Sequence, residues 1–287
     1  MADFWVIGPI AWDRVLRVPC LPPSGGFAQA TEVAQRPGGA GANVAVALAS
    51  TGASVHMAGY VGDDAPGARM LAVLAEAHVG VGFVHTRHGH TSEVDILVDA
   101  SGERTMIGIW PDLLHTVRVP VTQIRSGDVA YFAAWHEEFL PAMRQLSDRG
   151  AIVATVPPPR LAPGLPAMYL IGSQQQYAGQ DPRSALSAGS AMPVAAVVTR
   201  GGEGVVVHDR GGPAAYPAQQ ADVVDTTGAG DAFAAGFLHQ ISSGEPLGRA
   251  VAAGIIWAAA TVQEPASIPP PWPQVAGRVL ALPPDQR

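Results

Sequence analysis

The stretch "VVDTTGAGDAFAAGF" at 223–237 has a glycine-rich turn between two carboxylates, Asp225 before it and Asp231 directly after it. Its two valines are typical of a strand end, and the segment from Phe233 onward has the apolar period of a helix. Gly228, Ala229 and Gly230 would then form the helix entrance, where the first backbone N–H groups lack partners and carry the positive end of the helix dipole. Because these residues have almost no side chains, a phosphoryl group could approach their N–H groups closely.

Asp231 directly follows this predicted anion site. A carboxylate beside a bound anion is repelled, so its presence there needs a chemical reason. A general base that takes the proton of an attacking hydroxyl, next to a transferring phosphoryl group, supplies that reason. An aspartate that only caps the helix in a tight turn is the alternative.

A second glycine-rich segment, "GGAGANVAVALASTG" at 38–52, also opens a predicted helix. The pair Gly38-Gly39 allows a hinge in the backbone. Asn43 offers two donors and an acceptor, which suits the hydroxyl groups of a polyol. A second glycine-rich helix start makes it less plausible that Asp231 only caps its helix.

Together the two stretches resemble the two signatures of the ribokinase, or PfkB, family of sugar and nucleoside kinases. "GGAGANVA" matches the amino-terminal signature and "DTTGAGDAFAAGF" the carboxyl-terminal one, and the resemblance covers nearly the whole chain. It implies ATP-dependent phosphorylation of a hydroxyl, most simply a primary one, on a small sugar or nucleoside, with Mg²⁺ bridging the phosphates. Asp231 would be the general base, and the 228–230 amides would form the anion hole.

The resemblance also implies roles for residues outside that turn. Substrate contacts fall on Asp13, Gly39 and Asn43, and "TRGGEG" places Thr199, Gly201 and Gly204 near the nucleotide. Asp225 and Thr227 match positions that hold a monovalent cation such as K⁺ in some members of the family.

One departure from the family pattern concerns the motif Asn-x-x-Glu, which helps to organise Mg²⁺ and phosphates. The matching segment "IGSQQQYAG" has Ser173 and Gln176 in those places. Ser173 would lie near the nucleotide, and Gln176 would contact Mg²⁺ indirectly and more weakly, because the amide keeps an oxygen but loses the charge. A catalytically weakened sensor that binds sugars or nucleosides is therefore the alternative function.

The substrate class stays open between sugar and nucleoside. Ala40 occupies a position where some sugar kinases of the family have lysine, which disfavours sugar phosphates. Arg104 in "SGERTMIG" could supply a cation or lie in a solvated turn. Three tryptophans at predicted rim positions could stack on a base or only pack the lid: Trp12 beside Asp13, Trp110 at the end of the lid hairpin and Trp135 at a strand end.

Two histidine-containing segments invite other interpretations. "HTRHGH" brings His85, His88 and His90 to a spacing that could ligate a metal, but a surface loop is the better interpretation. His136 and Glu137 follow a predicted strand, where they could contact substrate, although a role for Glu137 in the first turn of a helix is simpler.

The elements that would position these residues alternate between strand and helix patterns, which is typical of a parallel sheet covered on both faces. Predicted helices cover 38–52, a segment capped by Asp64 and ending near 77, 137–149, 229–243 and 247–262. We expect an α/β, three-layer α/β/α fold with a mostly parallel sheet, as one ribokinase-like domain over 1–287. Lid segments at about 13–37 and 91–110 would pair as a small sheet, and the Pro-rich tail after 263 would run irregularly.

Composition narrows the classes further. The 287 residues have a net charge of -7 and no lysine, which excludes Schiff-base chemistry and lysine-dependent phosphate loops and argues against nucleic acid or membrane partners. A single cysteine, Cys20, and no basic leader favour a cytoplasmic protein. The absence of GxGxxG after the first strand disfavours a dinucleotide-dependent oxidoreductase. Exposed hairpin edges would allow a homodimer through the lid.

Overall fold

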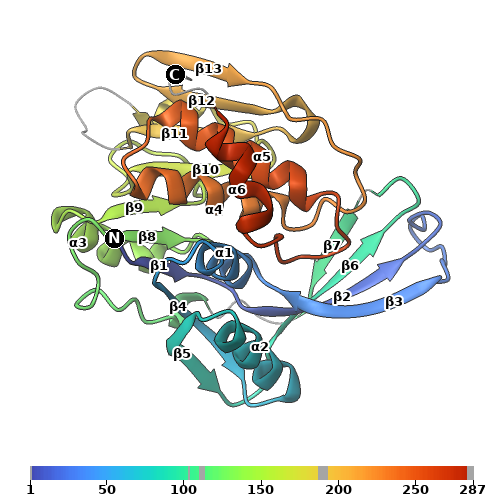
Figure 1. Cartoon of the computed structure of the whole chain (residues 1–287). Coiled ribbons are helices and arrows are strands. Elements are labelled where there is room, and N and C mark those ends of the chain that lie inside the picture. Colours follow the sequence, from blue (N-terminus) through green and yellow to red (C-terminus); the bar gives the residue numbers. More distant parts are fainter. Residues whose placement is uncertain (1, 103, 110–113, 187–192, 283–287) are drawn as a thin grey trace.

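The computed structural model describes residues 2–102, 104–109, 114–186 and 193–282, and its larger sheet runs through the body of the molecule (Figure 1). The strand order is β13-β12-β11-β10-β9-β8-β1-β4-β5. Neighbours from β5 to β11 pair in parallel, whereas β12 and β13 add an antiparallel edge. The strands span Phe4–Ile7 (β1), Val55–Gly62 (β4), Gly80–Arg87 (β5), Val129–Phe132 (β8), Ile152–Thr155 (β9), Tyr169–Ser173 (β10), Ala195–Thr199 (β11), Val205–Asp209 (β12) and Gly212–Tyr216 (β13).

Two separate apolar clusters form the core, one on each face of this sheet. Alternate residues of β1 point to opposite faces, so Phe4 and Val6 belong to one cluster while Trp5 and Ile7 belong to the other. The first cluster packs under most of the helices and the second under α3 and irregular segments. The helices span Ala40–Ala49 (α1), Ala65–Glu76 (α2), Leu140–Asp148 (α3), Ala229–Ser242 (α4), Leu247–Thr261 (α5) and Pro273–Leu280 (α6).

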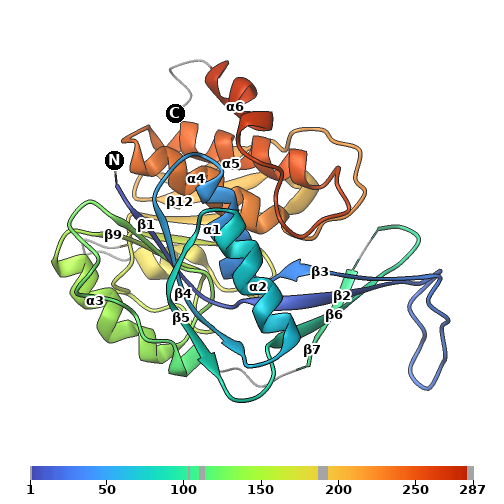
Figure 2. The same cartoon turned by 60° about the horizontal axis from the view of Figure 1, so that its bottom comes forward.

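A second, four-stranded sheet projects from the body as a lid, with the strand order β3-β2-β6-β7 (Figure 2). Its strands span Ala11–Arg17 (β2), Glu32–Gly38 (β3), Ser92–Val98 (β6) and Arg104–Gly108 (β7). The outer pairs are antiparallel, but β2 and β6 pair in parallel. The predicted pairing of two distant hairpin-like segments in one small sheet is therefore confirmed.

Local signals in the sequence agree with the helix starts. Asp64 caps α2 by accepting a hydrogen bond from the Gly67 N–H at 2.9 Å, and proline occupies the first turn. His136 caps the short 3-10 helix Glu137–Phe139 (η2) that leads into α3, which agrees with the helix-start interpretation of Glu137.

Three elements were not expected. Strands β5 and β13 are edge strands, and glycines interrupt or begin their sequences, so no clear strand pattern is visible. The prediction of an irregular tail is wrong for Pro273–Leu280, which forms α6. Proline is tolerated in the first helical turn, and Val275 and Val279, four residues apart, are both buried. Among the described residues, no helix has the length and apolar character needed to cross a membrane.

Candidate active site

The glycine-rich turn at 228–230 forms the entrance of α4, as predicted. Gly228 is the N-cap and has φ 78°, a left-handed conformation that favours glycine. A Cβ on Gly228 would also overlap the carbonyl oxygen of Ser267. Both the backbone conformation and the lack of space therefore require glycine at this position. Among the described residues outside this turn and its helix backbone, no atom lies within 4 Å of the place where Gly230 would carry a Cβ, so this side of the turn is open. An anion can therefore approach the N–H groups at the start of this helix, although the Ala229 N–H also donates to the Thr226 carbonyl oxygen at 3.4 Å.

Asp231 lies in the first turn of α4 and keeps part of its surface accessible. Burial raises the pKa of its carboxyl to about 7, although a hydrogen bond from Asn43 and the positive charge of Arg104 act in the opposite direction. The Nδ2 of Asn43 donates to Oδ2 of Asp231 at 2.8 Å. A carboxylate with a pKa near neutrality, oriented by an amide, suits a general base.

Asn43 comes from α1, so the entrances of the two signature helices meet. The side-chain oxygen Oδ1 of Asn43 is buried and, within the described part of the chain, has no hydrogen-bond partner. A buried acceptor without a donor is costly, and a substrate hydroxyl could relieve that cost. Gly39 precedes the helix with φ 91°, and a Cβ there would lie 2.6 Å from the Ala11 backbone nitrogen. Gly39 thus lets α1 approach the root of the lid.

Asp13 enters the same region from lid strand β2. Its side chain is buried, and the Ser267 Oγ donates to its Oδ2 at 3.0 Å. Burial raises the pKa of the Asp13 carboxyl to about 6, while Ser267 and Arg36 oppose this rise. The negative charge of Asp13 also raises the pKa of Asp231, so the two carboxylates lie near each other.

Asp225 differs from these two carboxylates because its charge is already neutralised. It is fully buried, its Oδ1 accepts the Thr227 N–H at 2.8 Å, and its Oδ2 accepts from the Arg36 Nη1 at 2.9 Å. Burial opposes ionisation of Asp225, but the hydrogen bonds from Thr227 and the Arg36 charge outweigh it and hold the pKa below its usual value. Both Asp225 oxygens thus accept a hydrogen bond and a guanidinium lies alongside, and the monovalent cation at Asp225 and Thr227 stays a prediction.

Arg104 reaches from lid strand β7 to the same loop. Its Nη1 donates to the Thr226 Oγ1 at 3.0 Å, and its charge lowers the pKa of Asp231. Of the two interpretations of Arg104, the structure favours a cation at the site over a solvated turn. A positive side chain thus faces the anion turn from the lid.

The predicted nucleotide residues lie at the carboxyl ends of neighbouring strands. Ser173 and Thr199 pair in the β10–β11 register, and Gly201 and Gly204 have positive φ values of 54° and 90° in the following turn. A Cβ on Gly204 would overlap the Tyr216 carbonyl oxygen. These residues form one edge of the sheet at which a nucleotide could bind.

Ser173 and Gln176 hydrogen-bond to each other rather than reaching outward. The Gln176 Oε1 accepts the Ser173 N–H at 2.8 Å, and the Ser173 Oγ accepts the Gln176 N–H at 3.2 Å. The Gln176 Oε1 thus already accepts one hydrogen bond, and its indirect contact with Mg²⁺ stays a prediction. Among the described residues no group of three or more His, Cys, Asp or Glu could hold a metal ion. Mg²⁺ in ATP-using enzymes takes its ligands mainly from phosphates and water, so this sparse donor set still fits it.

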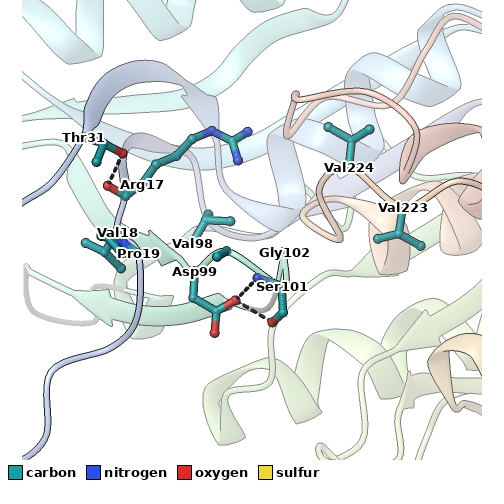
Figure 3. A pocket seen from close by; sticks show the side chains of 11 residues that line it. Arg17, Val18, Pro19, Thr31, Val98, Asp99, Ser101, Gly102, Val223 and Val224 are labelled. Carbon is teal, nitrogen blue, oxygen red and sulfur yellow. Dashed lines mark hydrogen bonds between the residues drawn. The ribbon is translucent and has the colours of Figure 1, made fainter.

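The remaining candidate residues lie elsewhere. His88 pairs with Asp63 at 2.9 Å on the surface, and His85 belongs to β5. Trp12 packs under Arg69, whose guanidinium carbon lies 5.5 Å from the ring, and Trp135 packs against the core, whereas Trp110 lies outside the described residues. A hollow of about 340 Å³ between the lid and 223–224 contains none of the predicted site residues (Figure 3).

Two residues of the site were missed by sequence reasoning. Arg36 stands two positions before the paired glycines, and a charged residue so close to a signature is a signal that could have been followed. Ser267 lies in the Pro-rich tail, where nothing in the sequence marks it.

Comparison with known proteins agrees with this geometry. The family model described as pfkB family carbohydrate kinase matches residues 1–148 and 170–274. An ATP-dependent ribose-1-phosphate kinase of Halopiger xanaduensis is 31% identical over 253 residues, covering 80% of this chain and 82% of that protein. A ribokinase of Cryptococcus neoformans in complex with ADP superposes with a TM-score of 0.79 at 21% identity, covering 97% and 100% of the two chains. A nucleoside kinase of Burkholderia thailandensis in complex with inosine gives 0.79 at 19% identity, covering 97% and 96%. The predicted fold is confirmed.

Proposed function

Because the chain belongs to the pfkB family of carbohydrate kinases, we propose that it transfers the γ-phosphoryl group of ATP to a hydroxyl, in the simplest case a primary one, of a small sugar or nucleoside. The observation that carries this proposal is the meeting of Asn43, Asp231 and Asp13 beside the open turn of α4. Three oxygen-rich side chains suit a polyol, and the turn beside them suits an anion.

The proposed reaction is a direct displacement. Asp231 takes the proton of the acceptor hydroxyl, whose oxygen forms a bond to the γ-phosphorus while the bond to the bridging oxygen of ADP breaks. Asp13 and Asn43 bind neighbouring hydroxyls and fix the direction of attack. The charge on the transferred group is stabilised by the 228–230 amides and by Arg104. Mg²⁺, held by the nucleotide phosphates and water, would neutralise phosphate charge.

Closure of the lid would keep water away from the phosphoryl group. Asp13, Arg36 and Arg104 all belong to lid strands, yet they hydrogen-bond to residues of the body, namely Ser267, Asp225 and Thr226. Lid position and site assembly are therefore linked, which supports treating 1–287 as one functional domain. Water excluded in this way cannot compete as the acceptor.

The alternative function, a sensor that binds ligand but turns over poorly, is less well supported. It rests on Ser173 and Gln176, whose side chains close a turn with each other. Burial raises the pKa of Asp231 to about 7, and the residue lies beside the turn of α4, which together suit a general base next to a phosphoryl group. We therefore favour the kinase.

Lid-to-lid association into a homodimer is a further part of the proposal. Several large apolar side chains of the lid are more than a third exposed, among them Phe27, Val33, Met106 and Ile107. Two edge strands, β3 and β7, leave backbone groups open on the lid. Sedimentation should give a dimer for the wild type and a monomer for Val33→Glu with Ile107→Glu. A monomeric wild type at assay concentration would contradict this arrangement.

The first experiment is acceptor-dependent ADP release from Mg-ATP over pentoses, hexoses, their phosphates and nucleosides. The phosphates belong in the panel because of the ribose-1-phosphate kinase relative, and nucleosides because of the inosine complex. We expect one acceptor to give turnover that Asp231→Asn lowers by about a hundredfold or more. Asp95→Asn, on the outer side of the lid, is the matched control and should keep full activity. Equal turnover in Asp231→Asn would refute the assigned base.

A further inference from the structure

The segment between α5 and α6 runs back to the root of the lid (Figure 1). Ser267 lies in this segment and is 1% exposed. Its Oγ donates to the Asp13 Oδ2 at 3.0 Å, joining positions 254 residues apart. A buried hydroxyl from the tail of the chain thus holds a carboxylate near its beginning.

The main chain of Ser267 is placed independently of that hydrogen bond. Its carbonyl oxygen packs so tightly against Gly228 that a Cβ there would overlap it. The backbone of Ser267 therefore contacts the glycine-rich turn at Gly228, and its side chain contacts the carboxylate of Asp13, the residue proposed to bind the acceptor. Replacing serine by alanine removes only the second contact, which isolates its effect.

Asp13 depends on this hydroxyl to an unusual degree. Within the described part of the chain, Ser267 is the only side chain that hydrogen-bonds to the Asp13 carboxylate. Arg36 lies opposite Asp13 in the β2–β3 register, but its Nη1 is bonded to Asp225. A buried carboxylate with one donor loses much of its stabilisation when that donor is removed.

The charged groups around Asp13 do not compensate for such a loss. Arg36 from β3 favours ionised Asp13, whereas Asp225, which precedes α4, disfavours it. Asp231 on α4 is coupled to Asp13 as a second negative charge. Burial is the largest influence and raises the pKa of Asp13 to about 6, so the hydroxyl acts against a strong tendency towards protonation.

We propose that Ser267 is a positioning residue for acceptor binding, whose hydroxyl keeps the Asp13 carboxylate ionised and oriented towards the hydroxyls of the acceptor. This inference rests on the kinase function proposed above, in which Asp13 binds the acceptor. With this proposal, a residue from the carboxyl-terminal segment between α5 and α6 also influences the binding of the acceptor.

The kinetic test compares wild type, Ser267→Ala and Ser267→Cys. A hydrogen bond to a charged group contributes enough that its loss should raise the acceptor KM about ten- to hundredfold, with the ATP KM and kcat little changed. The acidic limb of kcat/KM should move to higher pH, because Asp13 then protonates more readily. Ser267→Cys, a weak donor of similar size, should be intermediate. Thr261→Ala is the matched control, since it removes a buried hydroxyl whose hydrogen bond, among the described residues, goes to the Trp257 carbonyl.

A second readout does not need turnover. In protein with ¹³C-labelled aspartate carboxyls, the Asp13 signal, assigned through Asp13→Asn, should titrate at higher pH in Ser267→Ala than in the wild type. An unchanged Asp13 titration, or acceptor and ATP KM values rising in parallel, would overturn the positioning role. If the wild type phosphorylates no acceptor, the kinase proposal fails by itself, and the carboxyl titration still decides whether Ser267 controls Asp13.

Discussion

Arg36→Gln is the substitution whose effect can be worked out most fully from the structure. Arg36 and Asp225 are 2.9 Å apart, and their side chains are 13% and 1% exposed. Removing one partner of a buried ion pair costs about 3–5 kcal/mol, because the other charge stays buried and unpaired. Since Arg36 retains some contact with solvent, we expect the low end, a loss of about 3 kcal/mol in the free energy of unfolding.

The assay is urea unfolding at neutral pH of the wild type, Arg36→Gln, Asp225→Asn and the double variant. The sum of the stability losses in the two single variants should exceed the stability loss in the double variant by more than about 1 kcal/mol, which is the coupling energy expected for residues in contact. Arg14→Gln is the matched control. Arg14 pairs with Asp95 at 2.6 Å on the same lid, but their side chains are 45% and 18% exposed, so its loss should cost below about 1 kcal/mol.

Acid pH supplies an internal check on the same pair. The folded pKa of Asp225 lies below its unfolded value, so the pair contributes stability above the unfolded pKa and loses it as the pH falls. The difference between wild type and Arg36→Gln should therefore shrink below about pH 4. A coupling energy within about 0.5 kcal/mol of zero would refute the argument that these two charges stabilise each other.

The Arg36–Asp225 pair also predicts how the protein responds to monovalent cations. Because Arg36 already neutralises Asp225, wild-type stability and turnover should be equal in KCl and NaCl at the same ionic strength. Arg36→Gln leaves an unpaired carboxylate, so KCl should stabilise that variant more than it stabilises the wild type. Selective activation of the wild type by K⁺ would show that the guanidinium does not take the place of a cation.

Two further predictions concern Asp231. Arg104 lowers the pKa of Asp231, so Arg104→Gln should move the acidic limb of kcat/KM to higher pH, while Arg14→Gln should leave it in place. Burial raises the folded pKa of Asp231 to about 7, so the folded state binds this proton more tightly than the unfolded state and stability falls as the pH rises through this range. Asp231→Asn should therefore be more stable than the wild type, with an advantage that grows from about pH 4 to about pH 7, levels off above this range and is measured by urea midpoints.

Local chemistry determined much of the site without any knowledge of the fold. A turn made of Gly228, Ala229 and Gly230 at a helix start suits an anion, and Asp231 beside it indicates a general base. The capping of α2 by Asp64 follows from the same kind of short-range pattern. These features are readable because every interaction involved spans a few residues.

Tertiary structure alone decided which distant residues meet at that turn. Asp225 is 189 residues from Arg36, and Asp13 is 254 residues from Ser267, distances over which no periodicity or motif carries information. Such contacts depend on the strand order of the sheet and on where the tail crosses it after α5. The sequence by itself indicated the candidate reacting groups, because their chemistry is local. The fold determined their charge states and orientation, because burial and long-range partners exist only once the chain is packed.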